Sequence, residues 1–286
     1  MKKLLFLTCL VLIGITFGFR VFESDRSDLA AENLKGKVKK VVTYMRENGV
    51  DSDFVSKFIV HYNILGNISE FSLYDIRKAE KLYLSFIYTY DKQGRKTSTS
   101  NELGEVMSTS VYGHNLKNNL TETIFSRPSK HVGDYIVYNN RNSRDSMLFY
   151  DVSGKLSGSA IYSYDARGNL TEETRYKPDS EPDSKTVYNY DSKHQKLQET
   201  RYNSKGKQSW TTFKYDDKGN VIIQVDSNVM HTGGTVGIIP VHNVGPNIIT
   251  RTYSYSRFDK TDNWLDRQEM INGVPYRFTK REIEYY

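Results

Sequence analysis

The sequence predicts an all-β protein: a repetitive antiparallel meander of Tyr-Asp hairpins that forms one elongated, twisted and curled sheet, open or partly closed. Three observations predict this fold. A Tyr-Asp-x-x-Gly motif, complete or decayed, returns about every 25 residues, and such a period is typical of stacked repeats. The chain has 22 tyrosines, which favour half-buried strands. Six prolines and few alanines argue against a helical protein.

The Tyr-Asp-x-x-Gly motif predicts a tight hairpin turn. Complete copies occupy residues 90–94, 164–168 and 215–219, and weaker copies occupy residues 62–66, 150–154 and 190–194. The Asp carboxylate bonds backbone N–H groups just ahead of it, and the closing Gly adopts φ > 0 without a clash. A type I turn followed by a bulge satisfies both preferences. The residues with this structural role are Tyr90, Asp91, Gly94, Tyr164, Asp165, Gly168, Tyr190, Asp191, Tyr215, Asp216 and Gly219.

Each unit is predicted to contain a strand, the tight turn, a second strand and a looser turn. In residues 185–190, Val187 and Asn189 point to one face and Tyr188 and Tyr190 to the other, because strand side chains alternate. The second strand is polar, as in residues 170–176 and 197–202. The adjacent pair Glu172-Glu173 should face opposite ways in a solvated edge, which argues against an acid/base pair.

The aromatics that open the units are expected to form a stripe across the sheet. They are Tyr62, Tyr88, Tyr112, Tyr138, Tyr162, Tyr188, Phe213 and Tyr253, with spacings of 26, 24, 26, 24, 26, 25 and 40. Cross-strand aromatic pairs within this stripe would stabilise the sheet by roughly 0.2–1 kcal/mol each.

The N-terminus predicts export. Lys2 and Lys3 precede an apolar run, so residues 1–19 are interpreted as a signal peptide. The alternatives are an uncleaved anchor at residues 4–19, or lipidation of Cys9, the single cysteine. Residues 20–34 are expected to be a linker, the first strand starts near Gly36, and residues 35–286 form one repeat domain. The expected location is the periplasm, the outer surface or the medium.

The charge excludes one class of partner. Without Lys2 and Lys3, 38 basic residues face 34 acidic ones, and no block of five like charges occurs. This mild, dispersed charge argues against a nucleic-acid partner. Membrane contact is expected only through an uncleaved N-terminus, and the sequence predicts no cofactor and no oligomeric state.

The interval between Phe213 and Tyr253 is longer than the period and contains a Gly-rich insertion at residues 227–249. Such a loop either covers an open face of the sheet or contacts a ligand or partner. His231 and His242 lie in it, 11 residues apart, and are interpreted as incidental residues rather than metal ligands. Trp210 and Trp264 either stack on sugars together with the tyrosines or pack across strands. The candidate ligand-binding residues are Trp210, His231, His242 and Trp264.

The run from Tyr162 to Glu172 resembles the YD repeat of RHS proteins, and this resemblance covers about residues 55–285. The closing residues 264–286 resemble the end of small secreted YD-repeat proteins of Bacteroides-like bacteria. Large RHS proteins wind such strands into a shell around a C-terminal toxin. The present chain is too short for a large shell and ends in a repeat strand without a toxin domain, so the resemblance implies a smaller sheet, open or partly curled. Some RHS-like repeats are described as sugar-binding, which implies a glycan as one ligand class.

These observations favour an exported, non-enzymatic protein of the cell envelope that binds, or forms a scaffold for, a glycan or protein partner. Two alternatives stay open. One is a structural or accessory component related to RHS polymorphic toxin systems. The other is a glycan-active enzyme, which would need two carboxylates facing one cleft.

Overall fold

The computed structural model describes residues 27–47, 53–77, 79–126, 131–229 and 246–286. These residues form one short helix, α2 (Asp28–Ala31), and an 18-stranded antiparallel sheet. The strands are β1 (Val38–Glu47), β2 (Ser56–Tyr62), β3 (Ile68–Asp75), β4 (Lys81–Tyr90), β5 (Lys96–Asn101), β6 (Val106–His114), β7 (Leu120–Ser126), β8 (Val132–Tyr138), β9 (Arg144–Tyr150), β10 (Leu156–Tyr164), β11 (Leu170–Tyr176), β12 (Pro182–Tyr190), β13 (Lys196–Asn203), β14 (Gly206–Tyr215), β15 (Val221–Val229), β16 (Pro246–Phe258), β17 (Trp264–Ile271) and β18 (Val274–Tyr285). Within the described ranges, no helix is long and apolar enough to cross a membrane.

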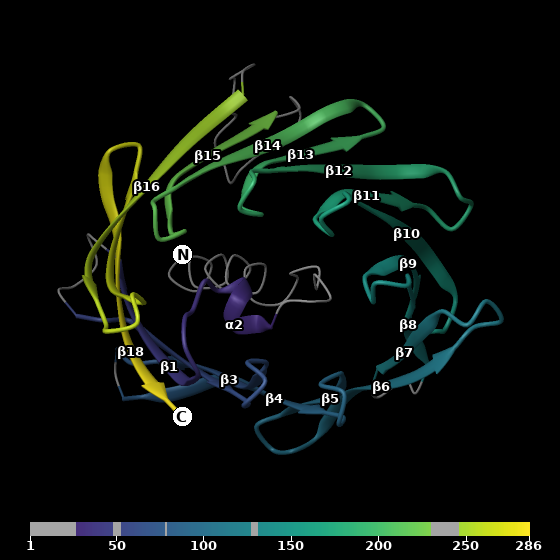
Figure 1. Ribbon diagram of the computed structural model, residues 1–286, viewed down its shortest axis with the longest axis horizontal. Helices are drawn as coiled ribbons and strands as arrows, with labels where there is room; N and C mark the ends of the chain where they lie inside the picture. The colour runs from purple at the N-terminus through teal and green to yellow at the C-terminus, as the bar shows by residue number, and fades with distance from the viewer. Residues whose placement is uncertain (1–26, 48–52, 78, 127–130, 230–245) are drawn as a thin grey trace, which may run out of the picture.

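The sheet closes into a barrel. Each strand pairs with its neighbours in sequence, and β1 pairs with both β2 and β18, so that Val41 lies opposite Val60 on one side and Ile283 on the other. Figure 1 shows the resulting ring. The expectation of an open or partly closed sheet is therefore wrong. Closure leaves no edge with unpaired N–H and C=O groups, which an open meander would have exposed on its first and last strands.

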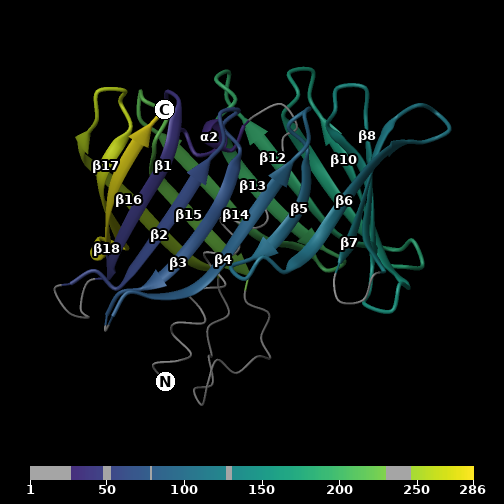
Figure 2. The ribbon, with the colours of Figure 1, turned by 90° about the horizontal axis from the view of Figure 1, so that it is seen from below.

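Simple geometry explains why so short a chain can close. Strands lie about 4.8 Å apart and tilt by about 40° in a barrel, so a ring of 18 strands is roughly 35 Å across. The strands are indeed inclined to the barrel axis (Figure 2). A small ring of this kind needs only two short strands per repeat.

The Tyr-Asp-x-x-Gly motifs form the tight turns at one rim of the barrel. In the first complete copy, the Oδ1 atom of Asp91 accepts hydrogen bonds from the backbone N–H groups of Gln93 and Arg95, both at 2.9 Å. Gly94 donates to the Asp91 carbonyl at 3.0 Å and has φ +77°. The register shifts immediately before Tyr90, which is a bulge. The same two side-chain bonds recur at Asp165 and Asp191, and Asp216 accepts the second of them, from the N–H of Asn220. This is the turn chemistry that the sequence predicts.

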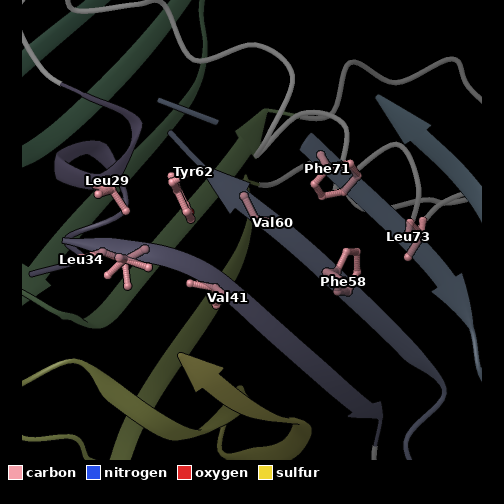
Figure 3. Packing of buried hydrophobic residues seen from close by; sticks show 9 residues of the cluster. Leu29, Leu34, Val41, Phe58, Val60, Tyr62, Phe71 and Leu73 are labelled. Atoms are coloured by element: carbon pink, nitrogen blue, oxygen red, sulfur yellow. The ribbon is translucent and has the colours of Figure 1, made fainter. Parts of the chain in front are cut away.

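Helix α2 lies inside the ring, near the rim that the tight turns form (Figures 1 and 2). Leu29 and Leu34 join a buried cluster with Phe58, Val60 and Tyr62 of β2 (Figure 3). Residues 27–34 were expected to belong to a loose linker, and the structure corrects this expectation. Their apolar side chains are buried against the wall, and Ser27 caps the helix by accepting a hydrogen bond from Ala30 N–H.

The position of α2 identifies the inner face of the sheet. Because Leu29 packs against Tyr62 from within the ring, the face that carries Tyr62 and Val60 lines the lumen. Residues directly opposite each other in neighbouring strands share a face. The register therefore carries this assignment around the barrel, from Val60 to Phe71 on β3 and Phe86 on β4, and onward to every strand.

Candidate functional site

The lumen wall carries the unit-opening aromatics, and all but Tyr62, which lies opposite Ile68, face a polar residue on the next strand; Tyr138 lies opposite Arg144. The opposed pairs are Tyr88 with Thr99, Tyr112 with Glu122, Tyr162 with Glu173, Tyr188 with Glu199, Phe213 with Gln224 and Tyr253 with Glu269. The aromatics therefore do form an inward stripe. They do not form the expected aromatic–aromatic pairs, because every second strand places an acid or another polar residue between them.

The acids of this stripe are buried, which the sequence did not predict. Glu173 is only 5% exposed and accepts a hydrogen bond from Arg175 at 2.6 Å. Its neighbour Glu172 faces outward and pairs with Lys185 on the outer surface. The two glutamates thus face opposite ways, as expected. The expected solvated edge is wrong for Glu173, because closure converts one face of the polar strand into the barrel interior.

The tyrosine of the Tyr-Asp-x-x-Gly motif links neighbouring hairpins. The Tyr90 hydroxyl donates to the carbonyl of Ile68, the first residue of β3, at 2.5 Å. Tyr215 donates in the same way to Lys196 at 2.8 Å, and that residue is the first of β13. The fixed repeat spacing could have suggested this contact, because it brings each tyrosine next to the start of the preceding unit's second strand.

Burial changes the acid–base chemistry of the stripe. Desolvation raises the pKa of Tyr88 to about 12, and the charge of Asp28 adds to this effect. Desolvation, followed by the charge of Glu269, raises the pKa of Tyr253 to about 12. Burial also lowers the pKa of Lys96, whose Nζ lies 4.4 Å from the centre of the Tyr88 ring. The phenols are therefore neutral hydrogen-bond donors at physiological pH.

Five alternating charges, here called the charge belt, cross the seam where the barrel closes. The belt consists of Asp226 on β15, Arg251 on β16, Glu269 on β17, Arg277 on β18 and Glu47 on β1. Asp226 forms an ion pair with Arg251, which lies 3.7 Å from Glu269. Arg277 lies 3.8 Å from Glu269 and 3.2 Å from Glu47. The belt therefore joins the last four strands to the first.

A second pair of lumen arginines lies beside the belt, on the side of the tight turns. Arg281 on β18 has its Cζ atom 3.6 Å from the centre of the Trp264 ring. Arg267 on β17 has its Cζ atom 5.0 Å from the same ring and 5.3 Å from that of Tyr253. We call Arg267 and Arg281 the arginine pair.

The structure separates the four candidate ligand residues. Trp264 is 7% exposed and belongs to the lumen wall with the arginine pair. Trp210 lies opposite Thr200 and Ser227 on the outer face, since the next residue, Thr211, bonds the lumen residue Asp226. The two tryptophans therefore share no stacking platform. His231 and His242 lie outside the described residues, as does most of the predicted insertion.

Two other features complete the survey of the described part of the chain. A cavity of about 500 Å³ lies at the rim between two tight turns and is lined by Asn139, Arg141, Ser143, Tyr162, Tyr164 and Asp165. In the same described ranges, no three His, Cys, Asp or Glu side chains come together as a metal site.

Comparison with known proteins gives weak likenesses. No protein-family model and no curated protein matches the chain. A porin-like protein from Bacteroides uniformis ATCC 8492 is similar, with a TM-score of 0.47 and 11% identity, over 86% of this chain and 96% of that chain. The TcdB2–TccC3–Cdc42 structure gives a TM-score of 0.33 and 14% identity, over 82% of this chain and 13% of that chain. The TcdB2–TccC3 structure gives 0.31 and 13%, again over 82% and 13%. No family model confirms the YD-repeat resemblance.

Proposed function

We propose that the protein is an exported, non-enzymatic binding scaffold of the cell envelope, related to YD-repeat proteins, whose lumen binds a glycan or protein partner. One observation carries this proposal. The inner wall is lined by neutral tyrosines and by buried charged groups, and it already holds a segment of its own chain.

The docked segment illustrates how a ligand would be recognised. Leu29 donates its N–H to the Gly66 carbonyl at 3.1 Å, and Asp28 accepts from the N–H of Ile68 at 2.6 Å. Asn33 donates to Asn220 at 3.0 Å, and Lys35 donates its N–H to the Asn263 side chain at 2.8 Å. Three tight turns thus hold one short peptide through polar contacts, while the wall supplies apolar burial. An extended ligand with polar groups would use the same two kinds of contact.

The polarity of the outer face supports a barrel with water on both sides. Glu172 and Lys185 form an ion pair on this face, with side chains 35% and 45% exposed. A lipid-facing strand surface is an apolar band, in which a central Lys costs about 2–4 kcal/mol. The proposal is therefore a scaffold in an aqueous compartment of the envelope, and not a pore.

A second candidate function follows from the enclosure of α2. A small shell that holds a chain segment is what a component related to RHS toxin systems would need, at a reduced scale. Copurification with a toxin or secretion component under native conditions would favour this candidate. Its absence from such complexes would count against it.

Neighbouring residues on β10 and β11 allow a matched test of the lumen. Tyr162 and Glu173 face inward, whereas Ile161 and Glu172 face outward from the same two strands. One variant carries Tyr162→Phe and Glu173→Gln, and the control carries Ile161→Val and Glu172→Gln. Both are tested with the parent chain for binding to purified envelope glycans and to envelope protein fractions, with folding checked by circular dichroism.

We expect binding by the parent and by the outer-face control, and at least a tenfold loss in the inner-face variant. Equal loss in both folded variants would overturn lumen binding. A folded parent that binds neither glycans nor envelope proteins at physiological salt would overturn the scaffold proposal.

A further inference from the structure

Four arginines of β16, β17 and β18 face the lumen, and they divide into two kinds. Arg251 and Arg277 belong to the charge belt, where each contacts two carboxylates. Arg267 and Arg281 form no ion pair among the described residues, and Arg267 is hydrogen-bonded to the neutral Tyr255 instead. Carboxylates of the lumen wall therefore balance the charges of Arg251 and Arg277, but no carboxylate pairs with Arg267 or Arg281 among the described residues.

The surroundings of the arginine pair are aromatic. Trp264 lies against both guanidinium groups, and Tyr253 lies against that of Arg267. Aromatic faces stabilise a cation by about 0.5–2 kcal/mol, but they do not cancel its charge. Burial is the main cause that lowers the pKa of Arg281, and the positive charge of Arg267 acts in the same direction. Two like charges held in one apolar wall remain unfavourable until an anion joins them.

We propose that the arginine pair of the lumen wall is a binding site for an oxyanion, a carboxylate or phosphate group carried by the ligand of the barrel. The planar fork of a guanidinium donates two parallel hydrogen bonds to such a group, which suits both anions better than any neutral ligand. Arg267 and Arg281 are half-buried residues of the lumen wall.

Helix α2 supplies the charge that such a ligand would compete with. Glu32, at the C-terminal end of α2, is the carboxylate whose charge raises the pKa of Arg281, against the larger effect of burial. It also raises the pKa of Tyr62, after desolvation, the main cause. An incoming oxyanion and Glu32 would therefore repel each other across the site. The inference deepens the proposed function, because it names the chemical group that the lumen recognises.

The site contains its own reporter. The chain has two tryptophans, so Trp210→Phe leaves Trp264 as the single one, in contact with both arginines. Fluorescence of this variant is recorded during titration with sodium glucuronate, with inorganic phosphate and with neutral glucose, at constant ionic strength. We expect a saturable change with one or both anions and none with glucose. The two anion titrations distinguish a carboxylate site from a phosphate site.

Three substitutions in the Trp210→Phe background test the assignment. Arg281→Gln should weaken anion binding by at least tenfold. Arg175→Gln removes a lumen arginine of β11 that Glu173 already neutralises, and it should leave the affinity unchanged. Glu32→Gln should strengthen binding by roughly three- to tenfold, because it removes the competing charge. A purely structural role for Glu32 would not produce a gain in affinity.

Saturable binding lost only in Arg281→Gln, with a gain in Glu32→Gln, would support the site. The inference is overturned if neither anion changes Trp264 fluorescence in a folded chain, or if Arg175→Gln weakens binding as much as Arg281→Gln. Should Arg281→Gln fail to fold, the gain in Glu32→Gln and the anion-over-glucose preference decide the question alone. Absence of anion binding, together with lumen-dependent capture of an envelope ligand, would refute this site and leave the proposed scaffold function intact.

Discussion

Neutralising Glu269 should weaken the closure of the barrel. Glu269 is 5% exposed and lies between Arg251 at 3.7 Å and Arg277 at 3.8 Å, at the centre of the charge belt. Glu269→Gln keeps the shape of the side chain but removes its charge. Breaking a buried ion pair typically costs 3–5 kcal/mol. We expect about 3 kcal/mol, at the lower end, because each arginine keeps a second acid in Asp226 or Glu47.

The assay is thermal and urea unfolding, followed by circular dichroism and tryptophan fluorescence. For a domain of this size, about 3 kcal/mol lowers the melting temperature by roughly 6–12 °C. The matched control is Glu284→Gln, because Glu284 forms an exposed pair with Lys39 at 2.8 Å and should leave the midpoint unchanged. Equal midpoints for Glu269→Gln and the parent, or equal shifts in both variants, would show that the belt does not stabilise the closed sheet.

Three further predictions concern the turns and the docked helix. Gly168→Ala should lower the free energy of unfolding by about 1 kcal/mol through the φ of +86° alone, because an added Cβ meets nothing within 4 Å. The control Gly113→Ala should be nearly neutral. Equal urea midpoints for the two variants would contradict this prediction. Asp151 accepts hydrogen bonds from the side chain and backbone of Ser153, which lower its pKa. Its stabilising effect is therefore complete above about pH 4 and is lost as the pH falls through the folded-state pKa. Asp151→Asn should make the urea midpoint less dependent on pH below about 4, and an unchanged pH dependence in that range would refute this prediction. Leu29→Ala should weaken the docking of α2 on the barrel wall by about 2–3 kcal/mol. Amide exchange should then be faster at residues 29–34 and unchanged in the sheet. Equally faster exchange across the whole barrel would contradict local docking.

The repeat could be predicted because its information is local. The turn at Asp91 and Gly94 needs only a carboxylate two and four residues from its backbone partners and a glycine that tolerates positive φ. The alternation that sends Glu172 and Glu173 to opposite faces is local too. Closure is not local. It depends on β1 meeting β18, a pairing between segments more than two hundred residues apart that no single repeat encodes.

The candidate site was missed for the same reason. Before closure is known, both faces of the polar strands look solvated, and Glu173, Arg267 and Arg281 read as ordinary surface charges. Closure encloses one face, and the register then decides that Trp264 lies inside while Trp210 lies outside. A shift of one residue in strand pairing would exchange these faces. The sequence does contain one usable signal: the Tyr–Glu opposition repeats with the period at Tyr112, Tyr162, Tyr188 and Tyr253.

The lumen chemistry supports our proposal that this barrel binds a ligand rather than only enclosing its own chain. A barrel that only encloses its content needs a wall without unbalanced charges. Ion pairs such as those of the charge belt provide such a wall. The arginine pair departs from that rule a few residues away on the same strands, at a cost in stability that an apolar or paired substitution would remove. Proteins tend to retain unfavourable charges where they act on a ligand. Replacing Arg267 by Met should therefore stabilise the folded chain, measured by urea unfolding, while it abolishes oxyanion binding. A loss of stability in that variant would indicate that the pair is part of the packing and not a site.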